Sequence, residues 1–328
     1  MKNIILVDKL HGIKERTSFF EVLEFIKANR DQKDKPFWID FYNPTASDLG
    51  EIAKIISLHH LTQEDILSKK VREKSEEFDD YLYVIGHALN YNPDHKLHDT
   101  VNVSILVYST FILSFHSKKV KSVEMVVERL KREALGKLPN EDWALYALLD
   151  GIVDVYEQEV NQFCNEVDAI DDAVLAYDEP EKLLRRISEE RRNLSLFRRR
   201  VGPKKELLQL LTYRDHPLVS KLTKTLLRDV YDHAIRMLEV LDMARDTLSS
   251  AQSNYLTQVS NRMNVVMKTL SIVATIMLPL SFITGLFGIN VHVPGQDANG
   301  NYWFFGIVAG MMVMAISMIV YFRHRHWF

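Results

Sequence analysis

The sequence is poor in cysteine and lacks the short motifs that mark most enzyme active sites. Cys164 is the only cysteine among 328 residues, so no disulfide forms within the chain and most of it is expected in a reducing compartment. No glycine-rich phosphate loop, HExxH helix or nucleophile elbow is present. Because no nucleophile, base and orienting group form a recognisable set, we predict neither an enzyme nor a resident cofactor.

Charge is unevenly distributed along the chain. From Asn261 onward four basic residues and one acidic residue give +3, whereas the first 260 residues hold 37 basic and 43 acidic residues, giving −6. A mildly acidic soluble part argues against nucleic acid as a partner and suits a surface that collects cations. The arginine-rich run 191–205 is interpreted as a charged helix face balanced by Glu189, Glu190 and Glu206, not as an RNA-binding segment.

Two long runs towards the C-terminal end contain no charged residue. They extend from Thr269 to Asn290 and from Tyr302 to Phe322. Each has about 20 residues, enough to cross about 30 Å of hydrocarbon at about 1.5 Å per residue. We therefore predict transmembrane helices at 265–290 and 302–322, joined by an outer loop at 291–301.

The basic residues that flank the two runs predict how the chain crosses the bilayer. Arg262 and Lys268 precede the first run and Arg323 and Arg325 follow the second, whereas the 291–301 loop holds no lysine or arginine. The positive-inside rule therefore places both termini, including a basic tail at 323–328, in the cytoplasm. A single hairpin is too small to enclose a pathway, so conduction requires several copies around an axis.

The sequence before the membrane predicts further regions. Residues 1–120 mix strand and helix patterns, which indicates an α/β domain with a mostly antiparallel or mixed sheet. Residues 121–217 are predicted to be helical, and residues 218–264 form the stalk of a helix that continues into the first span. The predicted fold class is an α+β cytoplasmic domain with a long helical stalk and two C-terminal transmembrane helices.

The stalk carries an apolar seam at alternating three- and four-residue steps, which indicates sustained packing against another helix. Two interpretations are open: packing within the monomer, or bundling with the stalks of other copies so that signals reach a pore. The seam residues are Leu227, Val230, Ala234, Met237, Leu241, Ala244, Leu248, Ala251 and Tyr255.

Several segments carry a family resemblance. They are Asn264–Lys268, Leu278–Asn290, the tail Tyr321–Phe328, the stalk segment Arg228–His233 and, more loosely, Trp38–Asp40. In these segments the chain resembles the CorA superfamily of magnesium and cobalt transporters. The resemblance implies a homopentamer in the plasma (inner) membrane of a prokaryote. Five α/β domains would form a cytoplasmic funnel, and the first span of each copy would line the pore.

The end of the first span reads Gly288-Ile289-Asn290, where the resemblance implies a Gly-Met-Asn selectivity signature. Magnesium gives up its water reluctantly, so a ring of Asn290 amide oxygens suits a hydrated ion, and Gly288 lets the backbone leave helical geometry. Isoleucine in place of methionine, and Gly295 where many magnesium members have glutamate, also fit the zinc-transporting branch. Mg²⁺, Co²⁺ and Zn²⁺ therefore all remain candidates for the transported ion.

One face of the first span matches the pore-lining positions that the resemblance implies. Asn264 and Ser281 would offer oxygen to a hydrated ion, and apolar side chains such as Leu278 would form a constriction that closes by dewetting. Without the resemblance, ordinary packing between membrane helices is the alternative. The predicted lining is Asn264, Met267, Leu270, Ala274, Leu278, Ser281 and Gly285.

Two charged clusters outside the membrane complete the predicted site. The resemblance implies that Asp229 binds a regulatory divalent cation between subunits, with Asp232 on the same turn and a partner carboxylate among candidates that include Asp79 and Asp80. Solvated carboxylates on a helix face are the alternative. The resemblance also implies a basic collar at the cytoplasmic entrance, made of Lys268, Arg323 and Arg325. The alternative for this collar is contact with lipid head groups.

The leading hypothesis is a channel for magnesium (and cobalt) influx, gated by cytoplasmic metal. A zinc transporter of the same superfamily, perhaps coupled to protons, is the first alternative. A membrane-tethered sensor or scaffold that conducts nothing is the second. The polar residues Asn264, Ser281 and Asn290 along an otherwise apolar span argue against the scaffold.

Overall fold

The computed structural model describes residues 4–8, 12–15, 18–90, 99–133, 140–176, 180–289, 302–325 and 327. The chain forms two compact units, Met1–Ala251 and Gln252–Phe328. The boundary between them falls inside one long helix, α7 (Lys221–Phe287). The first unit holds a mixed sheet and a helical bundle, and the second holds the end of α7 together with α8 (Tyr302–His324).

A seven-stranded sheet forms the centre of the first unit, in the order β2-β1-β3-β7-β6-β5-β4. Strands β3 and β7 are parallel, and every other neighbouring pair is antiparallel. The mixed sheet is therefore as predicted. The strands are β1 (Ile4–Asp8), β2 (Gly12–Glu15), β3 (Phe37–Tyr42), β4 (Lys74–Glu77), β5 (Leu82–Asn90), β6 (Asp99–Val107) and β7 (Phe111–His116).

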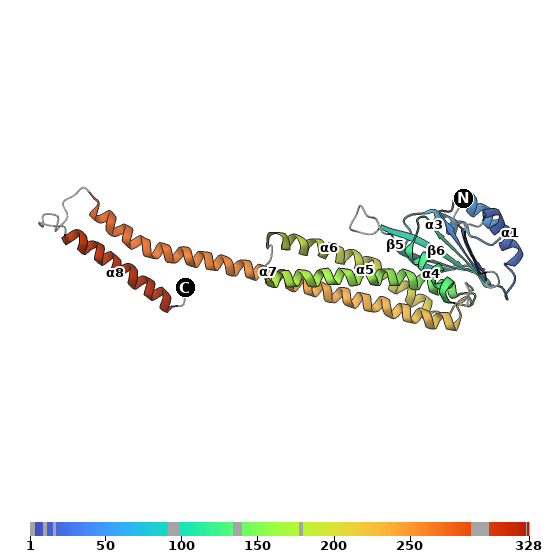
Figure 1. The fold of residues 1–328 in the computed structure, drawn as a ribbon. Helices are drawn as coiled ribbons and strands as arrows, with labels where there is room; N and C mark the ends of the chain where they lie inside the picture. Colours follow the sequence, from blue (N-terminus) through green and yellow to red (C-terminus); the bar gives the residue numbers. More distant parts are fainter. Residues whose placement is uncertain are drawn as a thin grey trace. The chain divides into compact units, whose positions relative to one another are not determined.

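Helices cover both faces of the sheet (Figure 1). Phe37, Ile39 and Phe41 of β3 alternate towards the face that also buries apolar side chains of α1, α2 and α3. Helices α4 and α5 cover the opposite face. The helix bounds are α1 (Phe19–Asn29), α2 (Ala46–Ala53), α3 (His60–Leu67), α4 (Lys121–Glu133) and α5 (Trp143–Ala176).

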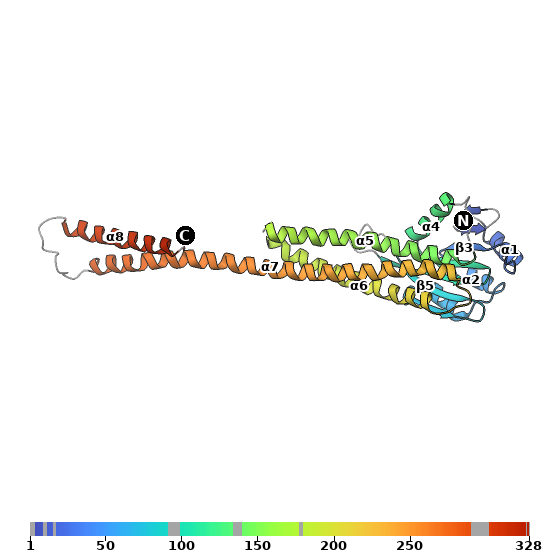
Figure 2. The ribbon, with the colours of Figure 1, turned by 90° about the horizontal axis from the view of Figure 1, so that it is seen from below.

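Helix α5, helix α6 (Pro180–Tyr213) and the first part of α7 lie side by side as a bundle (Figures 1 and 2). Within one chain the seam of α7 is buried from Leu227 to Ala251, whereas Tyr255 is half-buried. From Leu227 to Ala251 the seam therefore packs within the monomer, as the first interpretation has it. Both interpretations rested on the same spacing of three and four residues. This spacing shows that one face of a helix is packed, and it does not show which helix packs against it.

A buried polar network crosses the parallel pair β3 and β7. His116 Nε2 lies 2.8 Å from Asp40 Oδ2, and His116 Nδ1 lies 2.6 Å from the Lys118 carbonyl oxygen. Both neighbours are acceptors, so a doubly protonated ring makes both contacts as a donor, whereas a neutral ring makes one of them. Burial by itself would lower the pKa of His116, but the Asp40 charge and hydrogen bond outweigh it and raise the pKa above its ordinary value.

This network predicts a loss of stability on the alkaline side. The raised pKa of His116 means that the contribution is complete below about pH 6.5 and is lost as pH rises through the pKa of the folded protein. Neutral His116 can donate only one of its two hydrogen bonds. We expect the difference in melting temperature between the native chain and His116→Gln to shrink from pH 6 to pH 9, as thermal unfolding in detergent would show. A difference that grows with pH would contradict the assignment.

Candidate functional site: an ion pathway and its charged flanks

The second unit contains the apolar helices. Among the described residues, α7 and α8 are the two helices long and apolar enough to cross a membrane. In both views the end of α7 and α8 lie beside each other (Figures 1 and 2). Most of their large apolar side chains are exposed in a single chain, which is the surface expected for lipid and for further copies.

The predicted pore-lining residues fall on one side of α7. From Asn264 to Gly285 they follow steps of three and four residues, and the helix is continuous through Pro279. All of them are exposed in the single chain. Other faces of this stretch are exposed as well, so exposure does not select the face; the resemblance selects it, and the polar groups of Asn264 and Ser281 and the helical spacing agree with that choice.

The first span ends at the predicted selectivity motif. Helix α7 ends at Phe287, and the Gly288 N–H donates to the Gly285 carbonyl oxygen at 3.2 Å, which is a tighter turn than an α-helix makes. A Cβ on residue 288 would lie 3.0 Å from the Thr284 carbonyl oxygen, so glycine suits this close approach. Ile289 is exposed, and Asn290 and the 291–301 loop lie outside the described residues.

The predicted basic collar meets the aromatic end of α8. Lys268 Nζ lies 6.0 Å from the centre of the Trp327 ring, and Trp327 stacks on Phe322 with ring centres 5.3 Å apart. Ile272 and Phe322 are the buried residues of the second unit within its described ranges. This end of the hairpin is therefore where its two helices bury side chains, and Lys268 has a cation–π neighbour there. Arg325 lies against the Tyr321 ring instead, with 5.9 Å from its guanidinium carbon to the ring centre.

The predicted regulatory carboxylate lies in the first unit and faces solvent. The Asp229 side chain is 79% exposed, and Asp229 Oδ2 lies 3.8 Å from His233 Nε2. His233 Nδ1 also contacts Glu157 Oε2 of α5 at 3.1 Å. Asp232 is exposed as well, and Asp79 and Asp80 follow β4 in exposed positions. Within the described ranges, no three Asp, Glu, His or Cys side chains come together as a metal site.

Sequence reasoning missed an acidic row on α5. Asp150, Asp154 and Glu157 repeat at helical spacing, and Asp150 Oδ2 pairs with Arg129 of α4 at 3.1 Å. Desolvation raises the pKa of both aspartates, and the charges of Asp150 and Glu157 add to the rise at Asp154. The four- and three-residue spacing of these carboxylates was the available signal. Asp150 and Asp154 line a cavity of about 310 Å³ between α4 and α5.

A buried ion pair was also missed. Lys204 Nζ of α6 lies 2.6 Å from Glu73 Oε1, with side-chain exposures of 3% and 0%. The arginine-rich run of α6 was expected to pair with its own glutamates. Lys204 instead pairs with a residue of the α/β domain, because the fold brings the start of β4 against α6.

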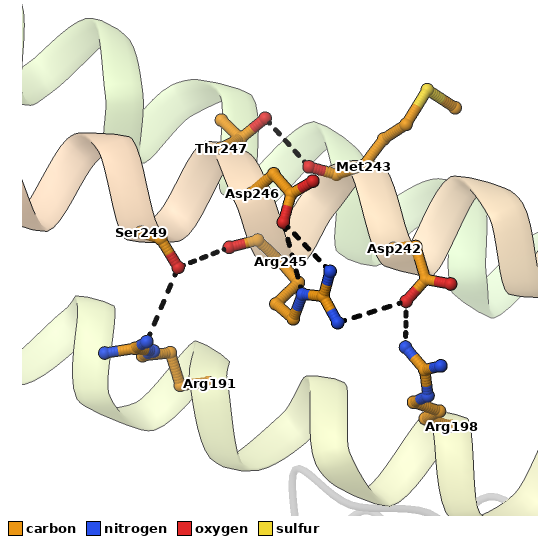
Figure 3. A network of polar contacts seen from close by, with 8 residues as sticks. All are labelled: Arg191, Arg198, Asp242, Met243, Arg245, Asp246, Thr247 and Ser249. Carbon is orange, nitrogen blue, oxygen red and sulfur yellow. Dashed lines mark hydrogen bonds and ion pairs between the residues drawn. The ribbon is translucent and has the colours of Figure 1, made fainter.

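Helix α6 and the stalk are joined by a second set of polar contacts (Figure 3). Arg198 pairs with Asp242 of α7, and Arg245 approaches the same carboxylate oxygen at 3.7 Å. Arg191 Nη2 donates to Ser249 Oγ at 3.4 Å. These partly exposed contacts align two helices and each contributes about 0–1 kcal/mol. They account for part of the arginine run without nucleic acid.

Comparison with known proteins identifies a matching family and a similar relative. The family model described as CorA-like Mg²⁺ transporter protein matches residues 33–324. The cobalt/magnesium transport protein CorA of Thermotoga maritima is 33% identical over 299 residues, which cover 89% of this chain and 83% of that protein.

Solved structures show the same fold. The complete CorA magnesium transporter from Methanocaldococcus jannaschii superposes with a TM-score of 0.79 over 99% of each chain, at 23% identity. The ZntB cytoplasmic domain from Vibrio parahaemolyticus gives a TM-score of 0.62 over 80% of this chain and 100% of that one, at 14% identity. At these identities both likenesses show the fold alone.

Proposed function

The chain belongs to the CorA-like Mg²⁺ transporter family, and on that premise we propose that it is a gated channel for divalent metal cations, most simply Mg²⁺ and Co²⁺, built as a homopentamer. The observation that carries the proposal is the face of α7 from Asn264 to Gly285. There, polar groups recur along a helix that is otherwise apolar enough to span a bilayer. One hairpin cannot enclose a pathway, and five copies of this face around an axis can.

The pathway in this proposal has a selective mouth and an apolar constriction. Asn290 and the backbone around Gly288 bind a hydrated ion through its water molecules. Ser281 and Asn264 then bind the hydrated ion further along the pathway. Met267, Leu270 and Leu278, all well exposed in the single chain, narrow the middle of the pathway. Lys268, Arg323 and Arg325 form a basic collar at its cytoplasmic end, with both termini in the cytoplasm of a prokaryotic cell.

Zinc transport is the second candidate because the fold is shared with a protein titled ZntB. Ile289, next to the proposed mouth, is the residue on which the zinc hypothesis rests. The relative titled cobalt/magnesium transport protein CorA, at 33% identity, favours magnesium and cobalt.

Uptake into liposomes tests the proposed function directly. Purified full-length protein would be reconstituted, and uptake of Mg²⁺, Co²⁺ and Zn²⁺ followed with and without an inside-negative potential and an inward proton gradient. We expect uptake of Mg²⁺ and Co²⁺ that rises with the potential, because a doubly charged ion gains about 4.6 kcal/mol per 100 mV. Zinc uptake that rises with the proton gradient, without magnesium uptake, would select the second candidate. No uptake of any ion would favour the scaffold.

Gating by cytoplasmic metal is proposed at Asp229. Its carboxylate is exposed, and no described group in its own chain completes a metal site, so a neighbouring copy would supply the remaining ligands. We expect Asp229→Ala to raise the cytoplasmic Mg²⁺ concentration that halves uptake by about fivefold or more, in the range of typical coupling energies. Asp246→Ala, which removes an exposed carboxylate of the same helix, is the matched control. Identical inhibition curves for the native chain and Asp229→Ala would refute this gate.

A further inference from the structure

A polar cavity lies where the parallel strands β3 and β7 end. It has a volume of about 420 Å³, within the range of small-molecule sites. Asn43 and Pro44 follow β3, Ser117 and Lys118 follow β7, and all four line it. Neither the ion pathway nor the regulatory carboxylates involve this cavity.

The two strands send the chain to opposite faces of the sheet at this point. After β3 the chain enters α2, whose Leu49 and Ile52 belong to the core cluster on one face. After β7 it enters α4, whose Val123 and Val127 line a cavity on the other face beside Asp40 and His116. Such a switch point, outside the carboxyl ends of adjacent parallel strands, is where open α/β sheets bind ligands. The β3–β7 pair is the parallel pair of the described sheet, so the position is specific.

The charge of the lining favours an anion. Lys69, Lys118 and Arg200 line the cavity together with a single carboxylate, Asp99. Three cations and one anion give +2, whereas the whole chain carries −3. Lys118 Nζ lies 3.6 Å from Asp99, and within the described ranges Lys69 and Arg200 have no carboxylate partner. Two cationic groups are therefore available to a ligand.

One backbone segment beside the cavity has an uncommon conformation. Asn43 has φ 51°, the one positive φ of a non-glycine residue among those described. Its N–H donates to the His116 carbonyl oxygen at 2.7 Å, which ties the ends of β3 and β7 together. On the opposite wall, Asn102 Nδ2 donates to the Ser68 carbonyl oxygen at 3.0 Å. Strained residues of this kind cluster at ligand sites.

We propose that this cavity binds the phosphate group of a small soluble ligand of nucleotide size. The Arg200 guanidinium and the Lys69 ammonium supply charge-assisted hydrogen bonds to phosphate oxygens, and the fork of Arg200 suits that geometry. Ile66 and Val101 provide an apolar wall for the rest of the ligand. The ligand would bind the cytoplasmic domain of the transporter away from its metal sites.

Calorimetric titration of the full-length protein in detergent, with EDTA present, tests the proposal. ATP, AMP and inorganic phosphate would be titrated separately, and the chelator prevents an ATP–metal complex from reaching the carboxylates of the stalk. We expect Arg200→Gln to weaken ATP binding at least about tenfold, because a hydrogen bond to a charged group is lost. Arg199→Gln, which changes the adjacent exposed arginine, is the matched control and should leave affinity unchanged.

A variant with the opposite expected effect on ATP affinity provides a second test. Asp99→Asn removes the one carboxylate of the lining and should tighten ATP binding. If inorganic phosphate bound as tightly as ATP, the cavity would be a site for the phosphate group alone. That result would overturn the proposal that the ligand has the size of a nucleotide. Absence of binding by all three probes at millimolar concentration, or equal weakening by Arg200→Gln and Arg199→Gln, would overturn the proposal.

Discussion

Lys204→Met is expected to destabilise the first unit by about 3–5 kcal/mol, because it leaves the Glu73 carboxylate buried without its counter-ion. Glu73 Oε1 accepts from Lys204 Nζ and from the His87 N–H, each at 2.6 Å. Glu73 Oε2 has no hydrogen-bond partner among the described residues. The carboxylate therefore depends on Lys204 for most of its stabilisation.

The surroundings of Lys204 show why the charge persists in the interior. Burial by itself would lower the pKa of Lys204, but the Glu73 charge and hydrogen bond raise it above its ordinary value. Its Nζ also lies 4.1 Å from the centre of the Tyr156 ring, a cation–π contact. A methionine keeps the unbranched apolar stem as far as Cε and removes the terminal ammonium group, so most of the loss reports the ion pair and its hydrogen bond to Glu73.

Thermal unfolding of the full-length protein in detergent would measure this effect. A loss of about 3–5 kcal/mol corresponds to a fall in melting temperature of roughly 6–20 °C for a unit of this size. Lys205→Met, at the adjacent position of α6, should change it little. The double variant Glu73→Leu/Lys204→Met should recover most of the loss, since a buried pair is often replaceable by apolar groups. A single variant as stable as the native chain would show that the pair is dispensable.

The parts of the fold that the sequence revealed are those encoded by local pattern. Two uncharged runs predicted the apolar helices, because about 20 apolar residues in succession have few other uses. Strand and helix patterns in residues 1–120 predicted a sheet domain with helices. Thr45, a residue type that commonly caps helices, caps α2 by accepting a hydrogen bond from the Asp48 N–H at 3.3 Å.

What the sequence could not reveal depends on contacts between distant residues. Glu73 and Lys204 are separated by 131 positions, and each lies in a run of other charged residues, so neither stands out. His116 and Asp40 are 76 positions apart and come together only because β3 and β7 are adjacent parallel strands. The cavity proposed to bind phosphate likewise collects side chains from separate loops, strands and α6.

The resemblance and the geometry contribute differently to the proposed ion pathway. The resemblance chose the lining residues on α7, and the geometry shows that they share one face of a continuous helix. The geometry also shows that the stalk seam is satisfied within its own chain. In the proposed pentamer, neighbouring copies would therefore meet through other surfaces, and Asp229 lies on an exposed one.

Asn290→Ala is expected to reduce magnesium uptake at least about tenfold, and more if every copy contributes an amide to the same ion. A hydrogen bond to a charged group contributes about 1.5–3 kcal/mol, and about 1.4 kcal/mol is a factor of ten. Asn290 follows Ile289, the last described residue of the span, and in the proposed pathway it binds the hydrated ion at the outer mouth. Asn254→Ala, which removes an exposed amide from α7 before the first span, is the matched control.

A third variant separates the binding of the ion from the choice of metal. Ile289→Met restores the signature that the family resemblance implies without touching the Asn290 amide. If the amide binds the hydrated ion and residue 289 only packs, this variant should keep native uptake and leave the preference among Mg²⁺, Co²⁺ and Zn²⁺ unchanged. A shift of preference towards magnesium would make Ile289 a selectivity residue. If uptake by Asn290→Ala equalled that of Asn254→Ala and of the native chain, the ion would have to be selected elsewhere, and Ser281 and Asn264 would be the remaining oxygen donors on that face.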